Sequence, residues 1–231
     1  MQNYYKTIGA LVVASAFAAG NASAEIESEI HVGYSSEYLF RGLNLGQDLT
    51  EAGLDVSTQY SGLDLSAGAW LGSFSNSADA DFDELDLYGE ASKDLGFVTA
   101  AVGYILYNNQ RLLGDDAQEV YFSVAKSLYG IDYSLTYFWD IETDNDGYAE
   151  LAGSKGFELS SCLTLNTGAA LAYFVEEGDL AHLTAKVSLD YAYSETATIS
   201  PFVAHSWGLG ETTNYSSENE FVAGTMLSVS F

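Results

Sequence analysis

The residues of this chain whose types suit chemistry are charged side chains set at even spacings. Asp132 and Asp140 lie eight positions apart, and His182, Lys186 and Asp190 follow one another at intervals of four. Even spacings put side chains on one face of an extended strand. A row of carboxylates on such a face lowers the energy of cations and raises that of anions. The pattern predicts an ion path, whose lining residues are expected to be Glu37, Arg41, Glu90, Asp132, Asp140, His182, Lys186 and Asp190.

Arg41 is a base among these acids, and the sequence leaves two interpretations of it open. One is a salt bridge, with Glu37 or with a carboxylate of a neighbouring strand. The other is a positive charge that narrows the path and sets its selectivity. Both place the guanidinium on the polar face of its strand.

Nucleophilic catalysis would need a hydroxyl and a base within hydrogen-bond reach of each other. His182 has Thr184 on the same face, and His205 is followed directly by Ser206. Adjacent residues of a strand point to opposite faces, so the second pair cannot meet in that way. His182 lies in a row with Lys186 and Asp190, where a network of charges explains it. The sequence therefore predicts that the protein is not an enzyme.

Metal and cofactor sites are not expected either. The segment 142–147 resembles the start of an EF-hand calcium loop, but its twelfth position would be Gly153 instead of a bidentate acid. A second group of loop acids is interpreted as solvated charge: Asp79, Asp81, Asp83 and Glu84.

Strong acidity limits the classes of partner. The chain has 33 acidic residues against seven Lys and Arg, and a net charge of −26. Nucleic-acid binding needs clustered bases, so no nucleic-acid partner is expected. Disorder is excluded as well, since 14% of the residues are aromatic and 48% are hydrophobic. Cys162 is the single cysteine, so no intramolecular disulfide can form.

Residues 1–24 have the features of a secretory signal peptide. Lys6 precedes an apolar run at 8–14, and the small residues Ala22-Ser23-Ala24 form an expected cleavage site. The mature protein is expected to be residues 25–231, one domain. No other stretch approaches the roughly 18 consecutive apolar residues of a membrane helix.

The elements that would position the charged residues are short strands of alternating polarity. Residues 131–141 show this best, with Tyr133, Leu135 and Tyr137 on one face and polar residues on the other. Twelve strands are expected, with ten as an alternative: 29–41, 52–60, 63–74, 84–92, 97–107, 118–126, 131–141, 148–157, 163–174, 182–193, 197–207 and 220–231.

Connections between these strands alternate in length. Long polar loops are expected after the odd strands, at 42–51, 75–83, 108–117, 142–147, 175–181 and 208–219, and tight turns after the even ones. Transmembrane barrels of the bacterial outer membrane have short periplasmic turns and longer extracellular loops. The fold class predicted is all-β, a single antiparallel transmembrane β-barrel with longer acidic extracellular loops. A soluble barrel or sandwich that buries its apolar face inward is the alternative.

One short motif carries a family resemblance. The residues Tyr34-Ser35-Ser36-Glu37-Tyr38-Leu39-Phe40-Arg41-Gly42, followed by Leu43-Asn44-Leu45-Gly46-Gln47, resemble the amino-terminal stretch of the TorF-type (gcw_chp) porins. That family's pattern is close to Ser-Asp-Tyr-x-Phe-Arg-Gly, and Glu37 stands where it usually has Asp. The resemblance implies a small outer-membrane barrel with a channel role and no defined substrate. Phe231 resembles the terminal aromatic by which barrel-assembly machinery recognises its clients.

The function expected is a passive outer-membrane porin, a narrow and cation-preferring channel for ions or small solutes. Expected partners are outer-membrane lipid and lipopolysaccharide, the assembly machinery through Phe231, and small cationic or neutral solutes. Two alternatives stay open, a non-conducting structural or adhesion barrel acting through acidic loops and a barrel enzyme. No feature of the sequence specifies a subunit interface.

Overall fold

The structure is a computed structural model that describes residues 26–75, 81–109, 116–142, 147–210 and 219–231. The expected signal peptide, 1–24, lies outside these residues. Within them, no helix is long and apolar enough to cross a membrane.

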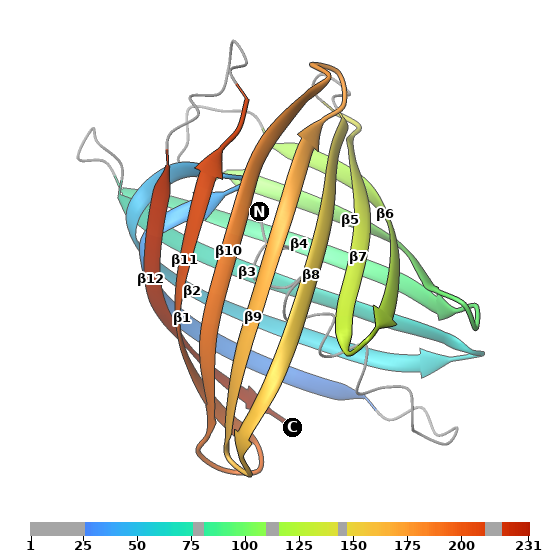
Figure 1. Cartoon of the computed structure of the whole chain (residues 1–231), viewed down its shortest axis with the longest axis vertical. Coiled ribbons are helices and arrows are strands. Elements are labelled where there is room, and N and C mark those ends of the chain that lie inside the picture. The colour runs from blue at the N-terminus through green and yellow to red at the C-terminus, as the bar shows by residue number, and fades with distance from the viewer. Residues whose placement is uncertain (1–25, 76–80, 110–115, 143–146, 211–218) are drawn as a thin grey trace.

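The described residues form twelve antiparallel strands that close into one barrel (Figure 1). Each strand pairs with its neighbours in the chain, and β1 pairs with β12 to close the ring. The predicted fold class and strand number are confirmed. The strands are β1 (Glu27–Phe40), β2 (Leu43–Tyr60), β3 (Leu63–Ser75), β4 (Asp81–Asp94), β5 (Thr99–Asn109), β6 (Ala117–Leu128), β7 (Ile131–Asp140), β8 (Gly147–Ser160), β9 (Leu163–Phe174), β10 (Asp179–Ala192), β11 (Ala197–Gly208) and β12 (Glu220–Ser230).

Closure leaves no strand of the barrel with an unpaired edge. The β1–β12 ladder runs from Glu29 opposite Ser230 to Ser35 opposite Gly224. The backbone amide of Phe231 donates to the carbonyl of Ser28 at 2.9 Å, so the C-terminal residue also joins this seam. We call the end of the barrel where β1 begins and β12 finishes the terminal end, and the other the loop end.

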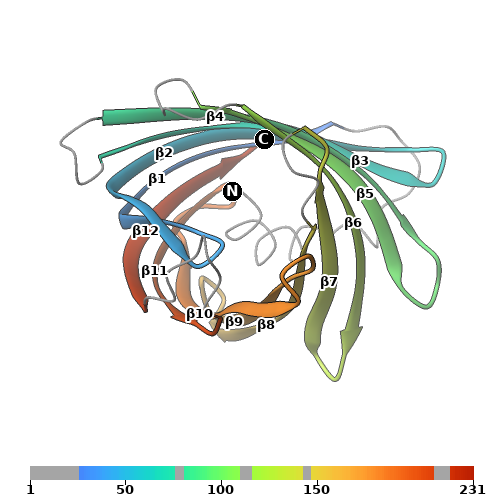
Figure 2. The same cartoon turned by 90° about the horizontal axis from the view of Figure 1, so that it is seen from above.

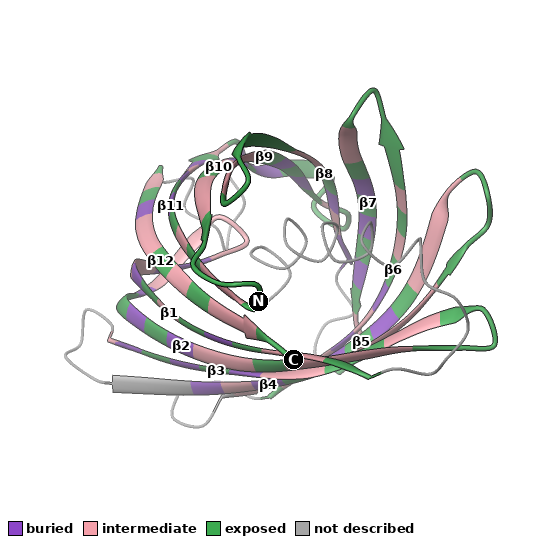
Figure 3. Ribbon diagram, turned by 90° about the horizontal axis from the view of Figure 1, so that it is seen from below, coloured by how far each residue is buried: buried purple, intermediate pink, exposed green. Residues whose placement is uncertain are grey.

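Alternation in the sequence becomes two faces of the wall. In β7, Ser134, Thr136 and Phe138 are buried, whereas Leu135 and Tyr137 are exposed on the outside. Figure 3 shows the same alternation of buried and exposed residues along the strands. The large exposed hydrophobic residues therefore cover the outer wall, and the interior holds polar and small residues together with buried aromatic rings such as Phe138. This arrangement is the reverse of a soluble barrel, whose apolar face points inward.

Connections at the terminal end are tight, as expected. Two of them, Ser61-Gly62 and Tyr129-Gly130, have positive φ at both residues, as in the primed turns that match strand twist. The expected long loop at 42–51 is wrong, because residues 43–51 are the first half of β2. The β1–β2 connection is the two-residue turn Arg41-Gly42, with φ of 47° and 82°.

The β1–β2 hairpin bends into the barrel instead of continuing outward. Its ladder shifts register between Tyr38 and Leu39, and Asp48 on the facing strand has a φ of 54°. Asn44 accepts a hydrogen bond from the Gly46 amide at 3.0 Å, which tightens the segment beyond the shift. Bulges of this kind bend a strand. In Figure 2 the blue end of this hairpin lies inside the ring of strands. Residues 38–46 are called the hairpin tip below.

Candidate functional site

Arg41 connects the hairpin tip to the opposite wall of the barrel. Its Nη1 and Nη2 atoms each lie 2.7 Å from a carboxylate oxygen of Glu119 on β6, a bidentate pair. The guanidinium carbon also lies 4.9 Å from the ring centre of Phe138 on β7 and 4.4 Å from that of Tyr148 on β8. Tyr107 on β5 donates to Glu119 at 2.9 Å. Parallel Arg–carboxylate bonds fix orientation as well as distance, so the tip is held in one position.

Tyr38 anchors one side of the tip. Its hydroxyl donates to Glu84 on β4 at 2.8 Å, and the residue is 1% exposed. The Tyr38 ring packs against Phe74, with ring centres 4.7 Å apart, and against Trp70 at 5.6 Å. Aromatic pairs at these separations contribute beyond the area they bury.

Leu39 and Gly42 hold the other side. Leu39 packs with Phe202 on β11 and Val222 on β12 in a buried apolar cluster. Gly42 lies so close to His182 on β10 that a Cβ at this position would be 2.6 Å from the imidazole ring. The hairpin tip therefore contacts the wall from β3 round to β8 and from β10 to β12.

His182 belongs to a buried chain of hydrogen bonds. Tyr148 lies 2.8 Å from its Nε2 atom, and Thr184 lies 3.0 Å from its Nδ1 atom. Thr184 in turn donates to Ser206 at 2.8 Å. This chain of hydrogen bonds positions His182 beside Gly42.

Acidic residues of the interior are held by neutral aromatic donors. Each donor lies on a strand near its acid, and each bond joins a phenol or indole to a carboxylate oxygen. The pairs are Tyr38 with Glu84, Trp70 with Glu51, Tyr88 with Asp55, Tyr107 with Glu119 and Tyr121 with Glu90. Neutral donors satisfy a carboxylate without cancelling its charge.

The eight residues expected along the ion path fall into separate groups. Arg41 and His182 meet at the hairpin tip, as described above. Glu37 faces Gln47 in the β1–β2 ladder just below it. Asp140 and Asp132 lie at opposite ends of β7, where Asp140 accepts from the Glu142 amide at 2.8 Å and Asp132 accepts from Ser127.

The remaining three lie along the wall below the tip. Glu90 accepts from Tyr121 at 2.8 Å, and Asp190 accepts from Asn166 at 2.7 Å. Lys186 places its ammonium 4.3 Å from the ring centre of Phe202. These groups belong to one interior surface and are not brought together into one cluster.

Glu119 is the functional candidate whose role was missed. Nothing in its own segment marks Glu119 as the partner of Arg41, which is 78 positions away in the chain. Glu84 was interpreted as a solvated loop acid and is instead buried inside β4. The signal that could have found Glu84 was even spacing, since Glu84, Asp86, Tyr88 and Glu90 continue one face of β4.

Comparisons with known proteins come from structure alone. No protein-family model matches the chain, and no curated protein matches it in sequence. Solved structures do match. The COG4313 outer membrane channel from Pseudomonas putida F1 is similar at a TM-score of 0.56 and 12% identity, covering 92% of this chain and 97% of that one. The KdgM porin is similar at 0.54 and 14% identity, covering 88% and 99%.

A third similar solved structure is named neither channel nor porin. The translocator domain of autotransporter NalP from Neisseria meningitidis is similar at a TM-score of 0.53 and 10% identity, covering 99% of this chain and 94% of that one. At these identities the likeness concerns the fold, a closed barrel, which proteins of different function share.

Proposed function

We propose that this protein is a passive channel of the bacterial outer membrane, narrowed by the hairpin tip and preferring cations. The observation that carries the proposal is the position of the tip, which reaches across an interior lined with carboxylates. Arg41 and Glu119 join it to the far wall at 2.7 Å. We assign the path of ions and small solutes to the interior beside the tip.

Membrane insertion accounts for the outer wall. Residues such as Leu135, Leu151 and Phe122 are 50–51% exposed there. Exposure of so many apolar side chains is unfavourable in water and favourable in lipid. Strands of 10 to 18 residues are long enough to span a bilayer, which takes roughly 9–11 residues of a tilted strand. Outer-membrane lipid and lipopolysaccharide are then the surroundings, and Phe231 is the proposed signal to the assembly machinery. The TorF-type resemblance fits this proposal, since its motif residues form the tip.

Cation preference follows from the charge of the inner wall. Interior acids such as Glu51, Glu84 and Glu90 have neutral hydrogen-bond donors, which do not cancel the charge of a carboxylate when it is ionised. Arg41 is paired with Glu119 and adds little net positive charge. An excess of carboxylate in a pore lowers the energy of cations.

Proteoliposomes test whether the barrel conducts and how narrow it is. Vesicles containing the purified protein should release K⁺ down its gradient and should exclude large neutral sugars. Empty vesicles and vesicles with heat-denatured protein serve as controls. Rapid passage of large sugars would contradict a narrow path, and K⁺ retention would contradict a channel.

A non-conducting structural barrel is the second candidate, and one observation favours it. The hairpin tip touches most of the wall, from Trp70 on β3 to Val222 on β12. Such an element could close the interior instead of narrowing it. K⁺ retention by vesicles with verified insertion would support this candidate.

A further inference from the structure

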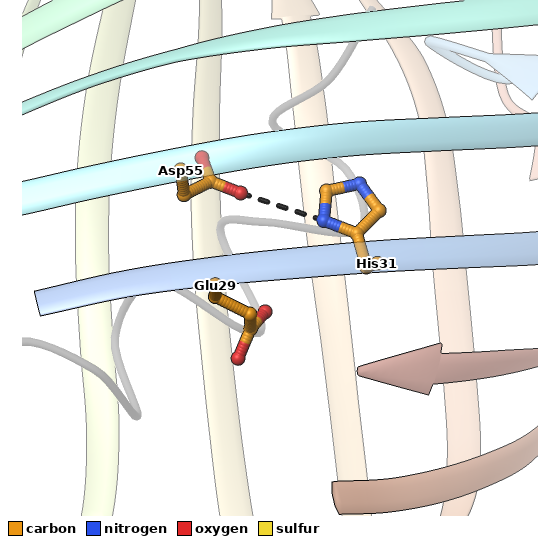
Figure 4. A group of neighbouring side chains, drawn as sticks. All are labelled: Glu29, His31 and Asp55. Atoms are coloured by element: carbon orange, nitrogen blue, oxygen red, sulfur yellow. Dashed lines mark ion pairs between the residues drawn. The ribbon is translucent and has the colours of Figure 1, made fainter. Parts of the chain in front are cut away.

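Three potential metal ligands lie close together inside the barrel near its terminal end. Glu29 and His31 lie two residues apart on β1, and Asp55 lies on β2 (Figure 4). One ligand atom from each, the two carboxylate oxygens and an imidazole nitrogen, lies within 4.8 Å of the others. The Nδ1 atom of His31 is 3.4 Å from Oδ2 of Asp55.

The ladder explains why these groups converge. Glu29 is directly opposite Asp55 in the β1–β2 register, and His31 is directly opposite Gly53. A Cβ at Gly53 would lie 2.3 Å from the His31 ring, so only glycine lets the imidazole lie across β2 toward Asp55. Two like charges directly opposite each other destabilise a sheet. Glu29 and Asp55 therefore occupy positions where a cation would relieve their repulsion.

Neighbouring hydroxyls orient the two carboxylates. Tyr88 on β4 donates to Oδ1 of Asp55, which leaves Oδ2 toward His31. Ser230 on β12 donates to Glu29 at 3.3 Å. Metal ligands are commonly held by such outer hydrogen bonds, which fix their direction.

We propose that Glu29, His31 and Asp55 form a zinc site. The His31–Asp55 separation is long for a hydrogen bond, but two ligands at 2.0–2.1 Å from a tetrahedral zinc lie about 3.3 Å apart. Rotation of the Glu29 side chain, which gives up its long 3.3 Å bond from Ser230, completes a set of three donors. One imidazole and two carboxylates suit Zn²⁺, whereas Ca²⁺ and Mg²⁺ prefer oxygen ligands alone. The fourth position would face the interior water.

The site goes beyond the proposed channel and does not depend on conduction, so binding is measured in detergent. Zn²⁺ is titrated calorimetrically into protein purified from membranes, with Mg²⁺ in excess to occupy weak acidic sites. One Zn²⁺ per chain is expected. H31Q and D55N should each weaken binding at least 10-fold, and Y88F, which removes an orienting hydroxyl, about 10-fold.

His205 supplies the matched control, because it lies on the outer wall with its ring 4.4 Å from that of Trp207. H205Q should bind Zn²⁺ as the native protein does, and a heat-dependent shift on gels verifies that each variant is folded. Absence of a one-to-one site in the folded native protein would overturn the proposal. Equal binding by H31Q and H205Q would also overturn it, since the acidic interior alone would then be holding the ion.

Discussion

At the scale of single residues, Arg41 fixes the hairpin tip against the far wall of the barrel. Its pair with Glu119 is bidentate, and the rings of Phe138 and Tyr148 lie beside the guanidinium. A planar guanidinium suits this place because Lys offers no such fork and stacks less well. The salt-bridge interpretation of Arg41 is the one that the structure contains, with Glu119 instead of Glu37 as the partner. The interpretation of Arg41 as a positive charge that narrows the path stays a prediction.

Substitution of Arg41 or of Glu119 should release the hairpin tip in both cases. The two substitutions should change the preference for cations in opposite directions. R41Q removes a positive charge and should raise both single-channel conductance and cation preference. E119Q leaves Arg41 without its carboxylate, so conductance should rise while cation preference falls. Breaking a buried pair of this kind costs about 3–5 kcal/mol, which urea unfolding would detect. Reversal potentials that shift in the same direction for both variants would contradict the assignment.

Gly42 gives a second test at this scale, with Gly62 as its matched control. Both glycines have positive φ, 82° and 77°. Alanine at either position strains the backbone by about 1–2 kcal/mol. Only at Gly42 would the new Cβ meet another residue, His182, because nothing lies within 4 Å of the corresponding point at Gly62.

G42A should therefore raise conductance by displacing the tip, whereas G62A should lower stability slightly and leave conductance unchanged. Planar-bilayer recordings and urea midpoints measure the two effects. Equal conductance of both variants would show that the contact between Gly42 and His182 does not position the tip.

At the scale of elements, the hairpin tip is the feature that the sequence predicted least well. Residues 42–51 were predicted to be a polar loop, because Asn44, Gln47 and Asp48 interrupt the alternation. The interruption accompanies a local bend: the ladder shifts register between Tyr38 and Leu39, and the hairpin tip beyond the shift lies inside the barrel (Figure 2). A search for alternating polarity assumes that a strand has one polar and one apolar face, so it does not identify a strand that bends into the interior.

Deleting residues 40–43 tests the element as a whole. The remaining β1–β2 ladder, from Glu27 to Tyr38, keeps the seam of the barrel intact. Conductance should increase, and medium-sized neutral sugars should enter proteoliposomes that the native protein excludes. Unchanged sugar exclusion in a folded deletion variant would show that another element limits the path.

At the scale of the whole molecule, the strands of the wall could be predicted because the alternation of polar and apolar residues within each strand identifies its outer and inner faces. Alternation in 131–141 is sufficient to assign its two faces. The contacts of the tip could not be predicted, since they join Arg41 to Glu119 and Gly42 to His182 across the closed barrel. Such pairs depend on the curvature and register of all twelve strands, which no single segment encodes.

Charge along the whole interior should set selectivity more than any one acid. Asp132 and Asp140 lie at the two ends of β7, so D132N with D140N removes a charge near each mouth. Cation preference should weaken without loss of conductance, because amides keep the size of the side chains. D48N is the control, since Asp48 accepts from Tyr34 on the outer wall. An equal effect of D48N would indicate that surface charge, not the interior, selects ions.

The central claim is that ions cross this barrel past the hairpin tip and that cations cross more easily than anions. The most direct test is the reversal potential of the purified protein in a planar bilayer under a salt gradient. We predict discrete current steps with a reversal potential of cationic sign. A silent bilayer despite verified insertion, or a reversal potential of anionic sign, would contradict the account.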